Sequence, residues 1–177
     1  PIFSNAQDQV PIYFSADEVE EDSKTGVITA RGDVNIAREN ITLKADTISY
    51  DRKNDVLVAD GNVSVMHPDG TVVFSDHAQL SEKMTKATIN EVKAILADQS
   101  RLAAKRIKQT SEKDKHFFYA VYSPCDVCKD NPKPLWSIKA RKITHDVSSK
   151  NIYYRSATLN IKDVPVLYTP FLSHPDP

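Results

Sequence analysis

Hydrophobic and polar residues alternate along much of this 177-residue chain. Residues 12–16 place apolar side chains at every second position, and residues 41–45 repeat the same alternation 29 positions later. A period of two is typical of a β-strand that buries one face, because successive side chains of a strand point to opposite sides. The pattern therefore predicts strands, and its return at a fixed step predicts a repeat.

A short phrase marks that repeat. Residues 45–51 read Ala-Asp-Thr-Ile-Ser-Tyr-Asp, residues 16–22 read Ala-Asp-Glu-Val-Glu-Glu-Asp, and a weaker copy stands at residues 75–80. The fixed Asp falls at positions 17, 46 and 76, a step of 29 and then 30 residues. A fixed step of this length indicates repeated units, each of which buries its apolar face against the next.

After each Ala-Asp pair the alternation slips by one residue, so that Val19 and Ile48 fall out of phase. Such a slip turns side chains to the other face of a strand unless a bend or bulge absorbs it. We therefore predict a corner at each Asp, with its carboxylate accepting nearby backbone N–H groups rather than acting in catalysis. Gly32 and Gly61, inside the strands that follow, also predict a bend or bulge.

The later copies are less regular. Residues 84–109 are rich in Ala, Lys, Glu and Leu, which favours a helix on propensity alone. Residues 104–107 nevertheless keep the phase of the repeat, so we predict strands there. Residues 136–146 restore the opening phrase, and residues 152–161 and 164–168 form a last predicted pair. The sequence thus predicts an all-β, elongated array of stacked repeats of about 29 residues.

Composition agrees with a folded domain, at 40% hydrophobic and 27% charged residues. No apolar run reaches the roughly 20 residues that a membrane-spanning helix needs, and no segment reads as a signal peptide. The net charge of −1 hides an asymmetry: residues 1–100 hold 9 Lys and Arg against 17 Asp and Glu, and residues 101–150 hold 12 against 5. The basic half indicates either an acidic partner or a solvated basic loop.

The apolar residues that alternate along the predicted strands would line an interior. A filled interior would make the protein a rigid spacer, whereas a splayed one would form an apolar trough suited to acyl chains. The residues predicted to line such a lipid groove are Phe14, Ile28, Val34, Ile36, Ile41, Leu43, Leu57, Val63, Val65, Val73, Phe118, Trp136 and Ile138.

The first predicted strand, residues 11–16, has no charged residue before Asp17. An open strand edge without charges is a template for the strand of another chain. Ile12, Tyr13 and Phe14 are therefore the candidate partner edge, unless residues 1–10, which we interpret as a loose leader, cover it.

Cys125 and Cys128 are the only cysteines. One C-x-x-C pair gives two of the four ligands that a structural zinc site needs, and a redox motif would require a βαβ context. We rank a disulfide, to each other or to other cysteines, above a metal site and a metal site above redox catalysis. The sequence predicts no metal, no cofactor, no catalytic group of nucleophile and base, and no nucleic-acid partner.

The repeated Ala-Asp phrase, the Ala-x-Gly-x-Val strand and the step of about 30 residues resemble the OstA-type β-jellyroll of lipopolysaccharide-transport proteins, which LptA, LptC and LptD share. The resemblance covers residues 12–172 in pattern. It is most specific at residues 122–125, 136–138 and 164–172, which resemble the end of the periplasmic domain of LptD.

The resemblance implies a splayed β-jellyroll over residues 11–172, with residues 173–177 as a junction toward an outer-membrane β-barrel. It implies a non-enzymatic role in lipopolysaccharide transport in the periplasm of a Gram-negative cell. The implied partners are lipopolysaccharide, the bridge protein LptA at the first strand, the barrel, and the lipoprotein LptE. Cys125 matches a family cysteine that bonds to the barrel, whereas Cys128 is an addition and leaves the pairing open. A stand-alone periplasmic jellyroll that binds lipid or acts as a bridge, and a structural spacer module, remain alternatives, followed by a β-helical polysaccharide-active enzyme.

Overall fold

The computed structural model describes residues 12–38, 40–81, 85–111, 113–124 and 134–175. These residues form strands and turns without a helix. The strands are β1 (Ile12–Ser15), β2 (Glu18–Asp22), β3 (Val27–Arg38), β4 (Ile41–Asp51), β5 (Val56–Met66), β6 (Val72–Ser81), β7 (Lys86–Ile95), β8 (Arg101–Gln109), β9 (Asp114–Ser123), β10 (Trp136–Asp146), β11 (Asn151–Ile161) and β12 (Val164–Pro175). The all-β prediction is confirmed, including strands rather than a helix in residues 86–109.

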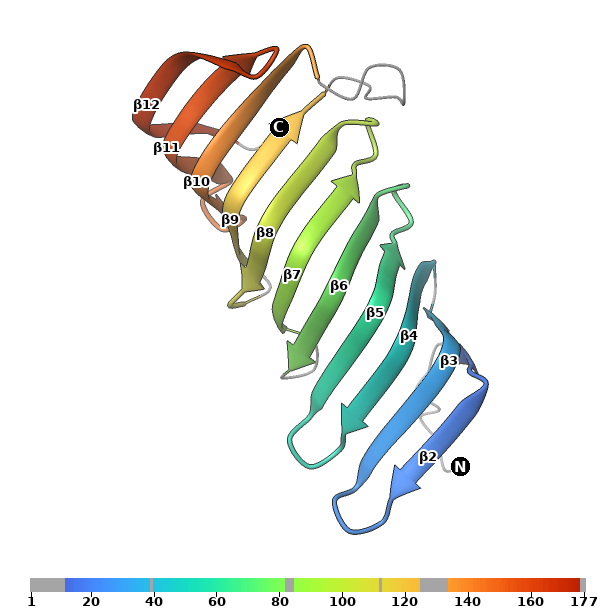
Figure 1. Ribbon diagram of the computed structural model, residues 1–177. Coiled ribbons are helices and arrows are strands. Elements are labelled where there is room, and N and C mark those ends of the chain that lie inside the picture. The colour runs from blue at the N-terminus through green and yellow to red at the C-terminus, as the bar shows by residue number, and fades with distance from the viewer. Residues whose placement is uncertain (1–11, 39, 82–84, 112, 125–133, 176–177) are drawn as a thin grey trace, which may run out of the picture.

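One antiparallel sheet contains all twelve strands, in chain order from β3 to β12. β1 and β2 both pair with β3, along its second and first halves, so together they form one interrupted edge strand. Figure 1 shows the long strands bent near their middle and stacked into an elongated shape, with β2 and β12 at opposite ends. Each strand thus contributes to two arms that meet at a corner.

The corners lie where the phase slip predicted them. Arg31 pairs with Thr47 and Val34 pairs with Ala45, so Gly32 and Asp33 stand opposite the single residue Asp46. Gly32 and Asp33 have φ values of +75° and +40°. This is a β-bulge, in which an extra residue bends the strand, and glycine favours the left-handed conformation because it has no Cβ. The same register shift recurs in β5 at Gly61 and Asn62, opposite Asp76.

The Asp carboxylate at the corner has a different partner from the one expected. Asp46 Oδ2 accepts a hydrogen bond of 2.9 Å from the Asn62 side-chain amide, not from a backbone N–H. A Cβ added to Gly61 would overlap this carboxylate, and one added to Gly32 would overlap that of Asp17. These two corners therefore each combine an Asp on one strand with a glycine on a neighbouring strand that leaves room for it.

Aspartate side chains stabilise the turns between strands. Asp51 Oδ1 accepts hydrogen bonds from the backbone N–H of Lys53 at 2.9 Å and of Asn54 at 3.1 Å. The Asn54 side chain donates to Asp51 as well and lowers the pKa of that carboxyl below its usual value, with further lowering by the Asn54 backbone N–H. Such Asx turns allow each strand to reverse directly into the next.

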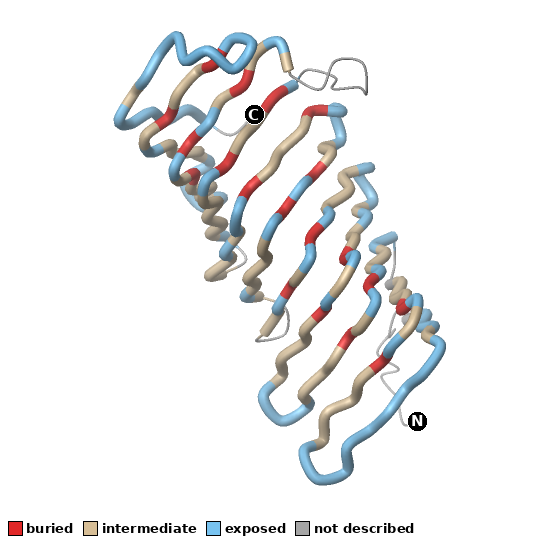
Figure 2. The backbone as a smooth tube through the Cα atoms, in the orientation of Figure 1, coloured by how far each residue is buried: buried red, intermediate tan, exposed pale blue. Residues whose placement is uncertain are grey.

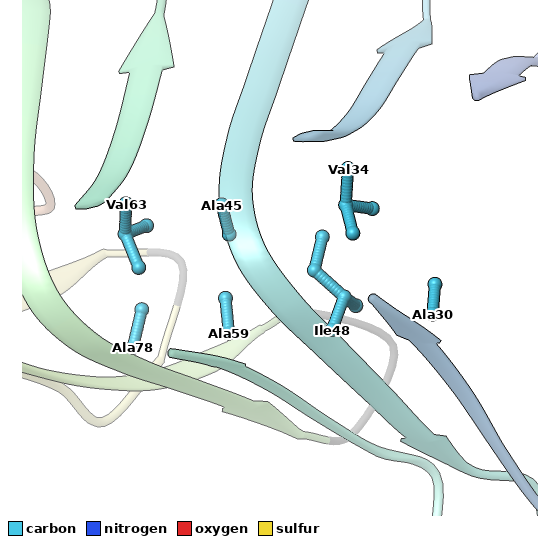
Figure 3. Packing of buried hydrophobic residues seen from close by; sticks show 7 residues of the cluster. All are labelled: Ala30, Val34, Ala45, Ile48, Ala59, Val63 and Ala78. Atoms are coloured by element: carbon cyan, nitrogen blue, oxygen red, sulfur yellow. The ribbon is translucent and has the colours of Figure 1, made fainter. Parts of the chain in front are cut away.

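Buried residues lie along the corners. Figure 2 shows them as a band that crosses the middle of successive strands, and Figure 3 shows the first cluster around the bend of β4. Across the described residues, the buried hydrophobic side chains are all Ala, Val or Ile. The two clusters contain Ala30, Val34, Ala45, Ile48, Ala59, Val63 and Ala78, and then Ala104, Ala120, Ala140, Ile143 and Ala157.

Small residues suit this position because the two arms converge at the corner, and close packing leaves little volume there. Ala104, Ala120, Ala140 and Ala157 stand directly opposite one another on consecutive strands. Larger side chains stand farther out on the arms.

Candidate functional site: the inner face of the bent sheet

We call the concave side of the bent sheet, where the two arms of each strand face each other, the inner face. Partly buried apolar side chains from both arms pack against each of the two buried clusters. These residues are Ala16, Ile36, Leu43, Leu57, Leu80 and Ile89 at the first cluster, and Leu102, Ile107, Phe117, Ile152 and Tyr154 at the second. The apolar lining is thus continuous along both halves of the stack.

Most of the residues predicted to line the groove lie on this face. Val34, Ile36, Leu43, Leu57 and Val63 belong to the first cluster or pack against it. Directly opposed residues of an antiparallel pair share a face of the sheet. Strand pairing therefore places four more predicted residues on the inner face: Phe14 opposite Ile36, Val65 opposite Leu43, Val73 opposite Val65, and Ile28 opposite Tyr50, which itself stands opposite Leu57. Ile41 and Trp136 lie two positions before Leu43 and Ile138 on the same strands and so share their side.

Phe118 is the exception, because it lies on the outer face. It stands opposite Arg106 and Lys142, and the Lys142 ammonium lies 5.7 Å from its ring centroid. Its neighbour Phe117 packs against the second cluster instead. Phe118 and Phe117 precede the corner at Tyr119, where φ is +51°. The slip in alternation at this corner exchanges the faces to which the preceding side chains point.

A cavity of about 390 Å³ opens on the inner face in the C-terminal half. Both arms contribute to it, together with the β7–β8 turn. Its walls are mainly apolar; the lining is Leu96, Asp98, Ser100, Leu102, Phe117, Tyr122, Ile138, Ile143, His145, Ile152, Tyr154 and His174. Ile138 is the one residue of the predicted groove among them.

Tyr154 supplies a polar group to the lining of this cavity. Its hydroxyl lies 3.1 Å from His174 Nε2, and the two rings stack with centroids 5.5 Å apart. Burial raises the pKa of the Tyr154 hydroxyl, and Tyr122 adds to the effect. The hydroxyl therefore stays protonated at neutral pH and can donate or accept a hydrogen bond.

Sequence reasoning missed Phe117, Ile143 and Tyr154. The signal was present, because Ala140 and Ile143 have the same spacing as Ala45 and Ile48 in the opening phrase, and Ala120 and Phe117 stand opposite Ala140 and Ile143 on the neighbouring strand. Applying the phase slip after Ala140 puts Ile143 on the inner face, and strand pairing then puts Phe117 there as well.

The predicted partner edge is an edge strand in the structure. β1 pairs with β3 on one side, and Tyr13 and Phe14 are 71% and 49% exposed. β12 forms the opposite edge, where Val164, Leu167 and Phe171 are each more than half exposed. β12 runs to Pro175, so it includes part of the segment assigned to the junction.

Residues 1–11, Cys125 and Cys128 lie outside the described residues. Within the described ranges, no group of three or more His, Cys, Asp or Glu side chains is placed to hold a metal ion. In the same ranges, no helix has the length and apolar character needed to cross a membrane. His116 is partly buried against β10, and burial, together with Lys142, lowers its pKa.

The described residues thus form an open, bent antiparallel sheet with an apolar inner face and an edge strand at each end. A family model described as LptA/(LptD N-terminal domain) LPS transport protein matches residues 13–151. The chain belongs to this family. The predicted resemblance to the N-terminal domain of LptD is confirmed at the level of the family.

Known relatives are similar over nearly the whole chain. The LPS-assembly protein LptD of Bordetella pertussis is 27% identical over 169 residues, which is 95% of this chain and 21% of that protein. The LptD proteins of Bordetella parapertussis and Bordetella bronchiseptica match to the same extent. The chain therefore spans about a fifth of the length of the curated relatives it matches.

A solved structure is similar as well. LptH of Pseudomonas aeruginosa, described as the LptA homologous periplasmic component of the lipopolysaccharide transport device, matches with a TM-score of 0.47 and 23% identity. The match covers 58% of this chain and 78% of LptH.

Proposed function

We propose that the inner face of the bent sheet is a groove that receives the acyl chains of lipopolysaccharide and guides them along the stack toward an outer-membrane barrel. Family membership supports the lipid class, and the apolar inner face supports the route. The groove residues proposed from the sequence serve this role, with Phe117 in place of Phe118 and with Ile143 and Tyr154 added.

The exposure of the large apolar side chains carries the proposal. Across the described residues, the hydrophobic core contains nothing larger than Ile. Leu43, Leu57 and Leu102 line the inner face but are only partly buried. A fold that kept these leucines for stability alone would gain about 25 cal/mol for each further Å² of apolar surface it buried. The splayed arms leave that surface available to an acyl chain.

The proposed path requires strand addition at both ends of the stack. The exposed β1 edge would accept a strand of the bridge protein LptA, because backbone hydrogen bonds can extend a sheet from one chain to the next. The β12 end would face the barrel and LptE. The transport would break no bond, so we propose no enzymatic activity for the domain.

Photo-crosslinking in cells tests the groove. A photoreactive amino acid at Leu43, Val65 or Ile138 should form adducts with lipopolysaccharide. The adjacent positions Lys44, Ser64 and Lys139 point to the outer face and should form few adducts. Equal labelling of both sets would contradict the groove, and absence of labelling from the inner set would favour the spacer alternative.

Strand addition is tested separately. Tyr13→Pro removes a backbone donor from β1, and Phe14→Asp puts a charge on it, so both should weaken retention of LptA in a pull-down. Val166→Pro makes the matched change on the β12 edge and should leave LptA retention unchanged. Unaltered retention by the β1 variants would exclude this edge.

A further inference from the structure

The outer face of β8–β11 carries a cross-strand row of cations and aromatic rings. Arg106 stands opposite Phe118, Phe118 opposite Lys142, Lys142 opposite Arg155, and Arg155 opposite Phe171 on β12. Because opposed residues share a face, these five side chains form one continuous row across five strands.

Further cations border this row. Lys105 and Arg141 lie at the corners beside it, and both are exposed, as are Arg106 and Arg155. Among the residues that the structure describes, these four cations and Lys142 form no ion pair with an acidic side chain. Arg106 donates to the neutral Asn90 side chain at 3.2 Å. The basic face, as we name it, comprises Lys105, Arg106, Arg141, Lys142 and Arg155.

The arrangement is costly for folding. Lys142 and Arg155 face each other directly across β10 and β11, and like charges in this position destabilise a sheet. The Phe118 ring 5.7 Å from Lys142 offsets part of the repulsion through a cation–π contact. An anion bound to this face would offset the remaining repulsion between Lys142 and Arg155. The basic face is therefore complementary to a negatively charged partner.

The basic face is also local. Strands β8–β11 contain nine Lys and Arg against two Asp, whereas β2–β5 contain three against eight Asp and Glu. An overall net charge of −1 would not attract an anionic surface. The separated charges instead orient the elongated domain, with its C-terminal half toward negative charge.

Exposed aromatic side chains lie among these cations. Tyr119 is 59% exposed at the corner of β9, and Phe171 and Tyr168 on the outer side of β12 are 57% and 61% exposed. Phe171 also contacts Tyr153, with ring centroids 6.4 Å apart. Tyrosine, phenylalanine and basic residues on one face are typical of proteins that bind the interface of a charged membrane.

We propose that this face docks the C-terminal half of the domain on the surface of an anionic lipid bilayer, with the cations on lipid phosphates and the aromatic side chains at the headgroup level. It is distinct from the inner groove, since it uses the opposite side of the same strands. The docking therefore does not depend on lipid occupying the groove.

Vesicle flotation tests the proposal. The domain should bind vesicles that contain phosphatidylglycerol and not vesicles of phosphatidylcholine alone, and salt should weaken the binding. One basic residue near an anionic surface strengthens binding about fivefold. The triple variant Arg106→Glu, Lys142→Glu, Arg155→Glu should therefore bind at least about a hundredfold more weakly than the wild type.

The matched control is Lys24→Glu, Lys44→Glu, Lys53→Glu, which changes the net charge equally at the other end of the stack. It should retain most of the binding; an equal loss in the control would overturn the local face. If the glutamate triple variant fails to fold by circular dichroism, Arg106→Gln, Lys142→Gln, Arg155→Gln removes the charges and also the Lys142–Arg155 repulsion. Wild-type binding by the glutamine variant would overturn the proposal, as would equally tight binding of single-stranded DNA at the same salt concentration.

Discussion

Gly61→Ala tests the corner that defines the groove, and we expect it to lower the free energy of unfolding by about 2–3 kcal/mol. Gly61 has a φ of +75°, and a residue with a Cβ pays about 1–2 kcal/mol in that region. The added Cβ would also lie 2.9 Å from Cγ of Asp46, and such overpacking costs about 1 kcal/mol or more.

Two comparisons separate these contributions. Gly70 has a φ of +88° and no atom within 4 Å of an added Cβ, so Gly70→Ala should show the backbone cost alone, about 1–2 kcal/mol. In an Asp46→Ala background the overlapping carboxylate is gone, and the cost of Gly61→Ala should fall by about 1 kcal/mol. Asp46→Ala alone loses its hydrogen bond with Asn62 and should cost about 1 kcal/mol.

Urea unfolding followed by far-UV circular dichroism and by the fluorescence of the single Trp136 measures each variant. In a linear stack each repeat contacts its neighbours only, so the transition seen by Trp136 should shift less than the one seen by circular dichroism. The corner argument fails if Gly61→Ala and Gly70→Ala cost the same, or if the Asp46→Ala background leaves the cost of Gly61→Ala unchanged.

Two further predictions concern the buried band and the turns. Ala120→Leu should lower the free energy of unfolding in urea by about 1–3 kcal/mol, because the larger side chain forces the arms apart at the corner. The control Ala97→Leu, in an exposed turn, should change it by less than about 0.5 kcal/mol. Similar costs for both variants would contradict a packed corner. The pKa of Asp51 is lowered from 3.8 by hydrogen bonds that the Asn54 side chain and backbone donate. Its stabilisation is therefore complete above the unfolded-state pKa and is lost as the pH falls through the lower folded-state pKa. Below pH 3.8, the stability of Asp51→Asn should depend less on pH than that of the wild type, and parallel curves would refute this linkage.

The sequence was most informative where local chemistry repeats. The Ala-Asp phrase, the glycines and the odd spacing to Ile48 together predicted a bend with a bulge, and the register shift at Gly32 and Asp33 confirms it. Repeat phase also outweighed helix propensity in residues 86–109. Strand pairing explains why, since an isolated helix would have left the edges of β6 and β9 unpaired.

Two features depended on tertiary structure and could not be read from the pattern. How far the arms splay depends on packing between residues more than ten positions apart, so the sequence left both a filled spacer and an open trough possible. The partner of the Asp46 carboxylate was likewise unpredictable, because Asn62 reaches it from the next strand only once the bulge has set the register.

The error at Phe118 shows what makes a corner visible in sequence. In β3 and β5 a glycine marks the bend, but in β7, β9 and β11 non-glycine residues take the left-handed conformation, with φ of +49° at Glu91, +51° at Tyr119 and +50° at Ser156. The feature common to both kinds of corner is the small or aliphatic residue that follows the bend, because the space between the converging arms constrains that side and leaves the bend itself exposed. The buried Val or Ala after the bend therefore locates the corner better than the glycine does. In β9 it decides which of two adjacent phenylalanines faces the proposed groove and which lies on the outer face beside the basic residues.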